Sequence, residues 1–409
     1  CLVGSEMCIR DRIKRSSKGT TVLIVSIMVL TFLNLVVVSG LLVGLISGAV
    51  LSFKNDWAAD VIITPESGRD IIENSPQLIS FIKTHPQTVH YSARISADGQ
   101  VLGTLDENAP KEEKPNQVGS RVMGIDPEAE EKLTNFSDAL IEGETLRRGE
   151  EGYILIGANL IKEYSSFGDV DIPGLNLLKG VKVGDKVRLT LSSGDGQVSK
   201  DLIVKGLVKS KVDEVSTRMF ILDTELRRML TVNQEQYQSI AVRLKDPLYA
   251  EKYVNQLIAF NGDNDALIQT AEQAIPSFLR DIQTTFNILG NALSSIALVV
   301  ASITVFIVIF INAVTRRKFI GIMKGIGISP KAIQVSYIMQ AFFYGVIGSA
   351  IGLFLTFVVL KPYFDANPIN FPFSDGILVA TPIGSAVRVA ILLVVTLLAG
   401  YILSLIHIS

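Results

Sequence analysis

The side chains best able to bind a metal ion or to act as nucleophiles are few in this sequence. His85 and His90 are five residues apart with Pro86 between them. That spacing differs from the i, i+4 separation that places two zinc-binding histidines on one helical face. Both cysteines, Cys1 and Cys8, lie in the first twelve residues, so the sequence predicts no disulfide framework and no metal site.

The loops that usually bind nucleotides or carry an acyl-transfer serine are also missing. No segment fits G-x-x-x-x-G-K-[ST], and no G-x-S-x-G elbow accompanies the serines. Gly321, Gly325 and Gly327 lie in a basic segment between apolar runs, not after a strand, so they do not form a nucleotide fingerprint. We therefore expect a non-catalytic chain with no directly bound cofactor and no nucleic-acid partner.

A basic segment, residues 315–333, stands between apolar runs at 288–314 and 332–360. An excess of Lys and Arg in a short loop is typical of the cytoplasmic side of a membrane. An ordinary loop of that kind is the simplest interpretation. The segment contains no acid and five basic residues, which are Arg316, Arg317, Lys318, Lys324 and Lys331.

The same segment has an apolar stripe at helical spacing. Its members recur at i, i+3, i+4 and i+7, while three of the basic residues recur every seven positions on another face. A short amphipathic helix at the membrane surface suits the docking of another protein. The residues that we expect to couple to such a partner are Arg316, Arg317, Lys318, Phe319, Ile322, Met323, Lys324 and Ile326.

The composition indicates a membrane protein with a polar insertion. Of the 409 residues, 48% are hydrophobic, the mean hydropathy is +0.39, and the apolar residues come in blocks. The net charge of −2 conceals an asymmetry, because residues 51–285 hold 36 acidic against 26 basic side chains. This asymmetry reports topology and does not identify an acidic or a basic partner.

The first apolar run, residues 20–51, is about twice as long as the roughly 7–15-residue core of a cleavable signal peptide. We therefore expect a signal anchor with a cytoplasmic N-terminus at residues 1–19. A helix of this length would extend ~48 Å against a hydrocarbon core of ~30 Å. Gly40, Gly44 and Gly48 give it a small face for close helix packing, within the chain or in a dimer.

Both ends of the sequence look foreign to the protein. Residues 1–12 and 403–409 resemble translated adapter sequence, and we expect them to be artefactual.

Residues 52–276 are polar enough for a folded extracytoplasmic α+β domain, with one more helical lobe and one more β-rich lobe. Residues 153–156, 187–191 and 202–208 are strand candidates in the β-rich part. Residues 106–116 contain two prolines and six charged side chains, which is typical of a solvated loop.

Three further membrane helices are expected after this domain. Residues 277–314 would form a stalk and the second span, 315–329 the coupling segment, and 330–360 the third span, with an external loop at 361–381 and a fourth span at 382–402. Arg388 near the outer end of the fourth span most simply extends to the interface. The third span has a second small face formed by Gly345, Gly348 and Gly352.

This organisation resembles the ABC transporter permeases of the MacB/FtsX superfamily, which include the LolC and LolE subunits. Residues 316–327 are similar to the coupling segment R-R-x-E-I-G-I-L-K-A-x-G of that superfamily, with Phe319, Met323 and Gly325 in place of the acid, the leucine and the alanine. Residues 286–402 would be an FtsX-like permease domain and 52–276 a MacB-like periplasmic core. Phrases at 122–128, 141–143, 153–157 and 183–187 look most like the lipoprotein-releasing branch.

The resemblance implies a multi-pass protein of the cell (inner) membrane whose large domain is periplasmic or extracellular. Its partners would be a separate ATPase subunit that uses ATP, a second permease copy in a homo- or heterodimer, membrane lipid, and a periplasmic carrier or adaptor. Motion of the coupling segment would pass to the external domain by mechanotransmission. Lipoprotein release is the favoured function, and the alternatives are drug or peptide efflux and FtsX-like signalling to an external partner.

Overall fold

A computed structural model describes residues 18–103, 115–165, 168, 176–193, 196–232, 236–262, 266–315, 317–371, 374–376 and 378–408. The expectations for residues 1–12, for Arg316 and for most of the 106–116 loop lie outside these ranges. The chain forms two compact units, a helical one (Cys1–Ser47, Phe278–Phe371 and Asp375–Ser409) and a mixed one (Gly48–Ser277 with Pro372–Ser374).

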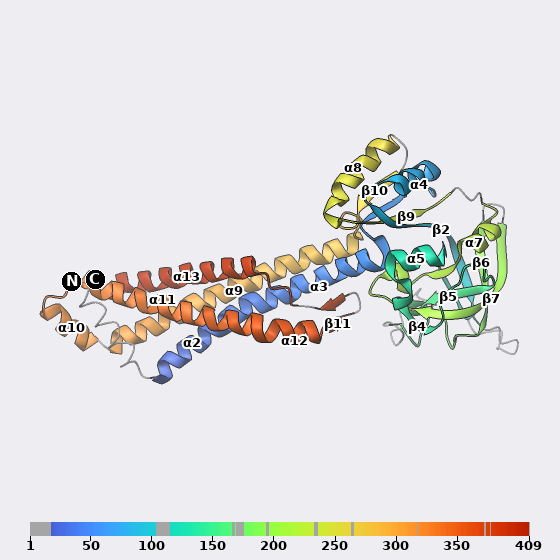
Figure 1. Ribbon diagram of the computed structural model, residues 1–409. Helices are drawn as coiled ribbons and strands as arrows, with labels where there is room; N and C mark the ends of the chain where they lie inside the picture. Colours follow the sequence, from blue (N-terminus) through green and yellow to red (C-terminus); the bar gives the residue numbers. More distant parts are fainter. Residues whose placement is uncertain are drawn as a thin grey trace. The chain divides into compact units, whose positions relative to one another are not determined.

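The helical unit consists mainly of long apolar helices (Figure 1). Widened π-helical turns, η1 and η6, interrupt two of them. The elements are α2 (Lys18–Leu33), η1 (Asn34–Val38), α3 (Ser39–Phe53, which enters the mixed unit), α9 (Ser277–Thr315), α10 (Arg317–Gly325), α11 (Pro330–Phe354), η6 (Leu355–Leu360), α12 (Lys361–Ala366), the short strands β11 (Ile369–Phe371) and β12 (Ser374–Gly376), and α13 (Pro382–Ile408).

Three helices of the described chain are long and apolar enough to cross a membrane, namely Thr21–Ala58, Ser277–Thr304 and Lys331–Ala366. Pro382–Leu398 is a shorter apolar helix within α13. The fourth span therefore remains an expectation from the sequence.

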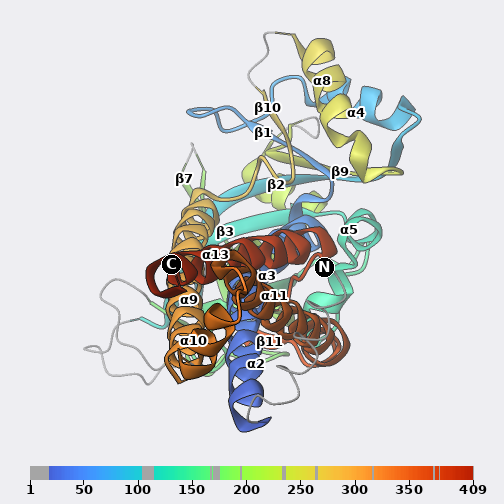
Figure 2. The ribbon, with the colours of Figure 1, turned by 90° about the vertical axis from the view of Figure 1, so that its left-hand side faces the viewer.

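Helix α11 packs between α2 and α13, and its glycines make the contacts close (Figure 2). A Cβ atom on Gly348 would lie 2.5 Å from the Cβ of Met28, and one on Gly352 would meet the ring of Phe32. On Gly345 it would lie 2.9 Å from a methyl carbon of Leu393. This small face brings α2 and α13 against α11 within one chain.

The glycines of the first helix are buried as well. Gly40 approaches the segment before α13, where an added Cβ would lie 2.9 Å from the carbonyl oxygen of Val379. Gly44 and Gly48 are also buried. At Gly40 the close neighbour is therefore another part of the same chain.

Over the residues that the structure describes, the mixed unit is built on ten strands with helices between them. Its strands are β1 (Val61–Pro65), β2 (Thr88–Leu102), β3 (Gln117–Ile125), β4 (Leu140–Gly143), β5 (Tyr153–Gly157), β6 (Lys186–Ser193), β7 (Gly196–Val208), β8 (Met219–Leu222), β9 (Ser239–Leu244) and β10 (Ala266–Thr270). Its helices and helical turns are η2 (Lys54–Ala58), α4 (Ser75–Thr84), α5 (Pro127–Thr134), η3 (Phe136–Ala139), η4 (Ala158–Leu160), α6 (Asp213–Ser216), α7 (Asp223–Leu230), η5 (Pro247–Tyr249) and α8 (Ala250–Asn261).

Six of these strands close into a barrel. The pairs β2–β3, β3–β8, β8–β5, β5–β7, β7–β6 and β6–β2 form a ring, and β4 extends it at β7. Alternate residues of the ring supply one apolar core, which includes Ile95, Val122, Ile154, Leu189 and Val204. This barrel is the β-rich lobe.

The other lobe is a four-stranded sheet in the order β10-β1-β9-β2, with neighbouring strands antiparallel. Together with α4 and α8 it follows a β-α-β-β-α-β pattern of ferredoxin-like type, into which the barrel is inserted between β2 and β9. Leu78, Ile82, Tyr253 and Leu257 of the two helices pack on this sheet. Strand β2 belongs to both lobes, because its first half pairs with β9 and its second half with β3 and β6.

The glycine contacts of α11 lead to a stability prediction. Gly348→Ala or Gly352→Ala should lower the thermal unfolding midpoint of the purified protein, because overpacking costs about 1–3 kcal/mol. Gly321→Ala is the matched control, since an added Cβ at Gly321 meets nothing within 4 Å. Equal midpoints for Gly348→Ala and Gly321→Ala would contradict the close packing of α2 on α11.

Candidate functional site

The first candidate site is α10, the short helix between α9 and α11. Gly327 has a φ of +91°, a conformation that glycine adopts without strain, so the chain can turn directly after the helix. Ser329 then caps α11, because its hydroxyl oxygen accepts a hydrogen bond of 3.4 Å from the backbone N–H of Ala332. A turn and a cap therefore position α10 between two apolar helices.

The expected apolar stripe of α10 divides between two environments. Met323 is partly buried, and with Ile320 it packs on a cluster formed by Met28, Ile333, Tyr337 and Ala341. By contrast, Ile322 is 58% and Ile326 75% exposed.

Helical geometry explains why Ile322 differs from Met323, whereas Ile326 is exposed just after the last residue of α10, Gly325. At about 100° per residue, Met323 lies about 60° from Ile320 but about 100° from Ile322. The surface available to a partner is therefore narrower than the sequence stripe, and it consists of Ile322 and Ile326 with the exposed Lys318. Of the remaining expected coupling residues, Arg316 lies outside the described chain, and the side chains of Arg317, Phe319 and Lys324 are not among those described.

A second candidate site surrounds Trp57 in the mixed unit. Arg94 of β2 is fully buried, and it forms an ion pair with the carboxylate of Glu130 on α5. The same guanidinium donates a 2.9 Å hydrogen bond to the backbone carbonyl of Trp57 and lies 4.0 Å from the centre of the indole ring. Ser92 donates a further hydrogen bond of 2.7 Å to Glu130. These contacts connect η2, β2 and α5.

The buried ion pair leads to a second stability prediction. Glu130→Gln should destabilise the protein by about 3–5 kcal/mol, because it leaves the Arg94 guanidinium buried without a carboxylate. Glu144→Gln removes the exposed pair with Arg147 and should cost only about 0–1 kcal/mol. Chemical denaturation followed by Trp57 fluorescence measures both, and equal losses would show that the buried pair is not needed.

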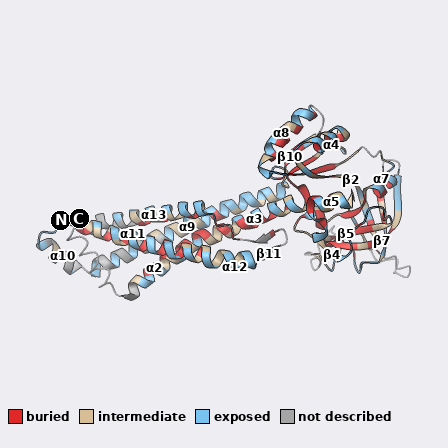
Figure 3. Ribbon diagram, viewed as in Figure 1, coloured by how far each residue is buried: buried red, intermediate tan, exposed pale blue. Residues whose placement is uncertain are grey.

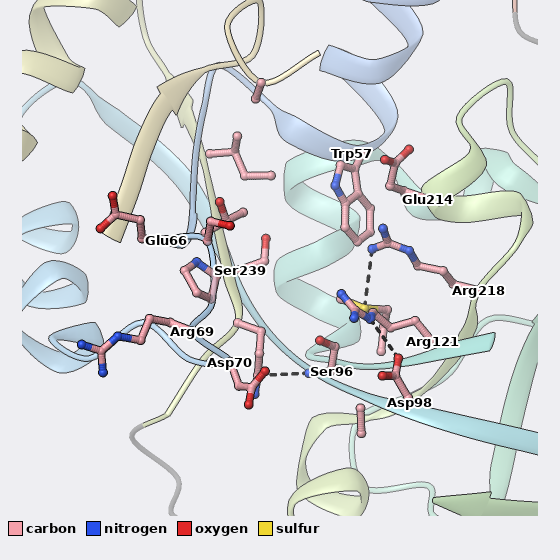
Figure 4. A pocket seen from close by; sticks show the side chains of 18 of the residues that line it. Trp57, Glu66, Arg69, Asp70, Ser96, Asp98, Arg121, Glu214, Arg218 and Ser239 are labelled. Carbon is pink, nitrogen blue, oxygen red and sulfur yellow. Dashed lines mark hydrogen bonds and ion pairs between the residues drawn. The ribbon is translucent and has the colours of Figure 1, made fainter. Parts of the chain in front are cut away.

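A cavity of about 760 Å³ lies beside Trp57 (Figure 4). Arg218, which follows α6, lines it with its guanidinium 4.6 Å from the centre of the Trp57 ring. Burial lowers the pKa of Arg218 to about 10, an effect that nearby Glu214 opposes and that Arg121 and Arg94 reinforce. Burial also raises the pKa of Glu214.

Sequence reasoning missed this cavity. Trp57 and Arg218 are distant in the chain and belong to no motif. The available signal was that Trp57 is the single tryptophan of the sequence, at the junction between an apolar run and a polar domain.

The histidines and carboxylates of the described chain form no metal site. Among its residues no group of three or more His, Cys, Asp or Glu side chains could hold a metal ion. His85 instead packs edge-on against Tyr253, with ring centres 4.6 Å apart, and its Nε2 lies 3.1 Å from the side-chain oxygen of Gln256. This arrangement joins α4 to α8.

The C-terminal part of the chain is similar to permeases. Residues 291–409 match the family described as FtsX-like permease C-terminal. An uncharacterized ABC transporter permease of Methanocaldococcus jannaschii is 25% identical over 179 residues, which are 43% of this chain. The match spans 43% of the length of that relative. These likenesses are to an FtsX-like permease family and to an ABC transporter permease, and they do not single out the LolC/LolE branch.

Two solved structures are also similar. The first is the periplasmic region of MacB from Actinobacillus actinomycetemcomitans, with 12% sequence identity and a TM-score of 0.36. The alignment covers 55% of this chain and 94% of the MacB chain. The second is the extracellular domain of the noncanonic ABC-type transporter YknZ from Gram-positive bacteria, with 11% sequence identity and a TM-score of 0.32. The alignment covers 51% of this chain and 98% of the YknZ chain. At these TM-scores neither likeness establishes a shared fold.

Proposed function

We propose that this chain is the permease subunit of an ABC transporter of the MacB/FtsX type, with four membrane spans and a MacB-like external domain. The observation that carries the proposal is the match of residues 291–409 to the FtsX-like permease family, because that region contains α10 and the helices on either side of it. The long apolar helices and the folded insertion between α3 and α9 agree with such a subunit.

The ATP that drives the transporter would be used by a separate ATPase subunit. The sequence contains no phosphate-binding loop of its own. Helix α10 offers Ile322 and Ile326 as exposed apolar contacts in a basic segment without acids. Because Met323 already packs on the bundle, docking would rest on the two isoleucines and would not use the whole stripe.

The length of the helices favours a mechanical coupling. Helix α9 has 39 residues, which correspond to roughly 58 Å against a hydrocarbon core of ~30 Å. Such a helix would project beyond the bilayer and transmit motion of α10 to the external domain. Arg388, the charged residue within α13, donates a 2.7 Å hydrogen bond to Ser39 and therefore packs two helices together.

A second permease copy would cover part of α9. Ile296, Val299, Val300, Ile303 and Ile307 of this helix are all exposed, and much of α9 carries the colour of exposed residues in Figure 3. Lipid would cover the same side chains in a monomer, so their exposure alone does not require a dimer.

We keep lipoprotein release as the proposed process, with drug or peptide efflux and signalling to an external partner as alternatives. The phrases that resemble the lipoprotein-releasing branch lie partly in strands of the external domain, where Val122, Met123, Ile154 and Leu155 are buried. Because these residues are buried in strands, their types are set mainly by packing and not by the substrate.

The docking proposal is tested by co-purification. A candidate ATPase, chosen as the product of a neighbouring gene and co-expressed with the full chain, should co-purify with the wild type. Ile322→Asp combined with Ile326→Asp should reduce its recovery at least tenfold, because each change would place a carboxylate in an apolar contact at a cost of more than about 1 kcal/mol.

Leu248→Asp is the control, because Leu248 is 93% exposed in the mixed unit and its replacement should leave recovery unchanged. Undiminished recovery with the double variant would remove the docking role of α10. Loss of ATPase with both variants would point to a general defect.

A further inference from the structure

We propose that the cavity beside Trp57 binds an organic anion, with a carboxylate or phosphate on Arg218 and an apolar group against the cavity wall. This inference concerns the external domain alone and does not depend on whether the chain pairs with an ATPase.

Arg218 is the first reason for proposing an anion. Within the described chain, no carboxylate oxygen lies within 4.0 Å of its guanidinium, and its contacts are the Trp57 ring and a 3.8 Å approach of Nη1 to the sulfur of Met123. A desolvated guanidinium normally gains its stability from a paired acceptor. Arg94, on the same indole ring, already has that acceptor in Glu130.

The cavity wall supplies a second, independent observation. Ser239 of β9 lines the cavity and is 6% exposed, and its buried hydroxyl oxygen has no hydrogen-bond partner among the described residues. Unsatisfied buried hydroxyls are uncommon, because each loses its water without compensation. A ligand with polar atoms would satisfy the Ser239 hydroxyl as well as Arg218.

The shape and composition of the cavity favour an anion that also carries an apolar group. Its volume of about 760 Å³ is within the range of small-molecule sites. Phe53, Trp57, Ile62, Met123 and Leu230 line it in addition to the polar groups. Burial of a short alkyl or aromatic group against these side chains would add to the charge-assisted hydrogen bonds of Arg218.

The charges around Arg218 limit the anion to one end of the cavity. Arg121 lies nearby and is paired at 3.3 Å with Asp98 (Figure 4). Glu214 faces Arg218 without reaching ion-pair distance, and its raised pKa reflects its burial. Glu66 and Asp70 line the opposite end. The anionic group would therefore lie between Arg218 and Arg121.

The experiment uses the full chain in phosphatidylcholine nanodiscs. Trp57 is the only tryptophan, so its fluorescence reports on the proposed site directly. Hexyl phosphate and hexanoate should each give a saturable change in emission. Hexanol, which has the same alkyl group without the charge, should not, and inorganic phosphate should bind at least tenfold more weakly than hexyl phosphate.

Substitution of Arg218 tests which residue carries the binding. Arg218→Gln should raise the dissociation constant for hexyl phosphate at least tenfold, and Arg218→Lys should raise it by less because the charge is kept. Arg147→Gln removes an exposed arginine that does not line the cavity, and it should leave the constant unchanged. If Arg218→Gln does not fold, the proposal is tested by the dissociation constants of the wild type and Arg218→Lys for hexyl phosphate and by the response to hexanol.

The outcomes separate clearly. The proposal would be overturned if neither hexyl phosphate nor hexanoate gave a saturable response, or if hexanol bound as tightly as they do. It would also be overturned if the wild type, Arg218→Lys and Arg218→Gln all bound hexyl phosphate with the same affinity. Equal affinity for inorganic phosphate would overturn its apolar part. Replacement of part of the phosphatidylcholine by phosphatidylglycerol identifies the source of the anion. A change in Trp57 emission that needs Arg218 but no added probe points to a lipid headgroup. If no such change occurs, the anion is a soluble one.

Discussion

The mixed unit depends on the burial of one guanidinium. Arg94 has no access to water, so its charge must be compensated inside the protein, and Glu130 and the Trp57 carbonyl provide the acceptors. Meeting this requirement fixes α5 and η2 against β2. It also fixes the Trp57 ring, on which Arg218 lies and beside which the cavity opens. One electrostatic constraint thus determines both the packing and the candidate binding site.

Local sequence signals identified many elements but not how they join. Residues 153–156, 187–191 and 202–208 were expected as strands, and they lie within β5, β6 and β7. Barrel closure could not be expected in the same way, because it needs residues of β2 and β6 that are 86 to 92 positions apart in the sequence, such as Leu102 with Arg188 and Gly99 with Leu191, to pair. Caps show the same limit at short range. Asp126, which precedes Pro127, caps α5 through its side chain, whereas Ser75, which precedes Pro76 in the same way, is the first residue of α4 and donates a hydrogen bond to the carbonyl of Ile72.

The two candidate sites differ in how far the sequence could reach them. The stripe in α10 follows from helical spacing, but spacing cannot tell which part of a wide apolar arc already packs on other helices. Ile320 and Met323 face such a cluster while Ile322 and Ile326 do not. The Trp57 cavity combines residues more than 150 positions apart, and only the fold brings Arg218 to Trp57.

The insertion of the barrel has a consequence for the order of events during synthesis. Strand β1 pairs with β9 and β10, and both follow the whole barrel in the chain. While the ribosome makes residues 66–238, the apolar strand Val61–Pro65 has neither of its neighbours, and both of its edges are free to pair wrongly. The barrel can close before the ferredoxin-like lobe does. A nascent chain of this protein therefore needs its first strand protected until the last strand of the domain has emerged.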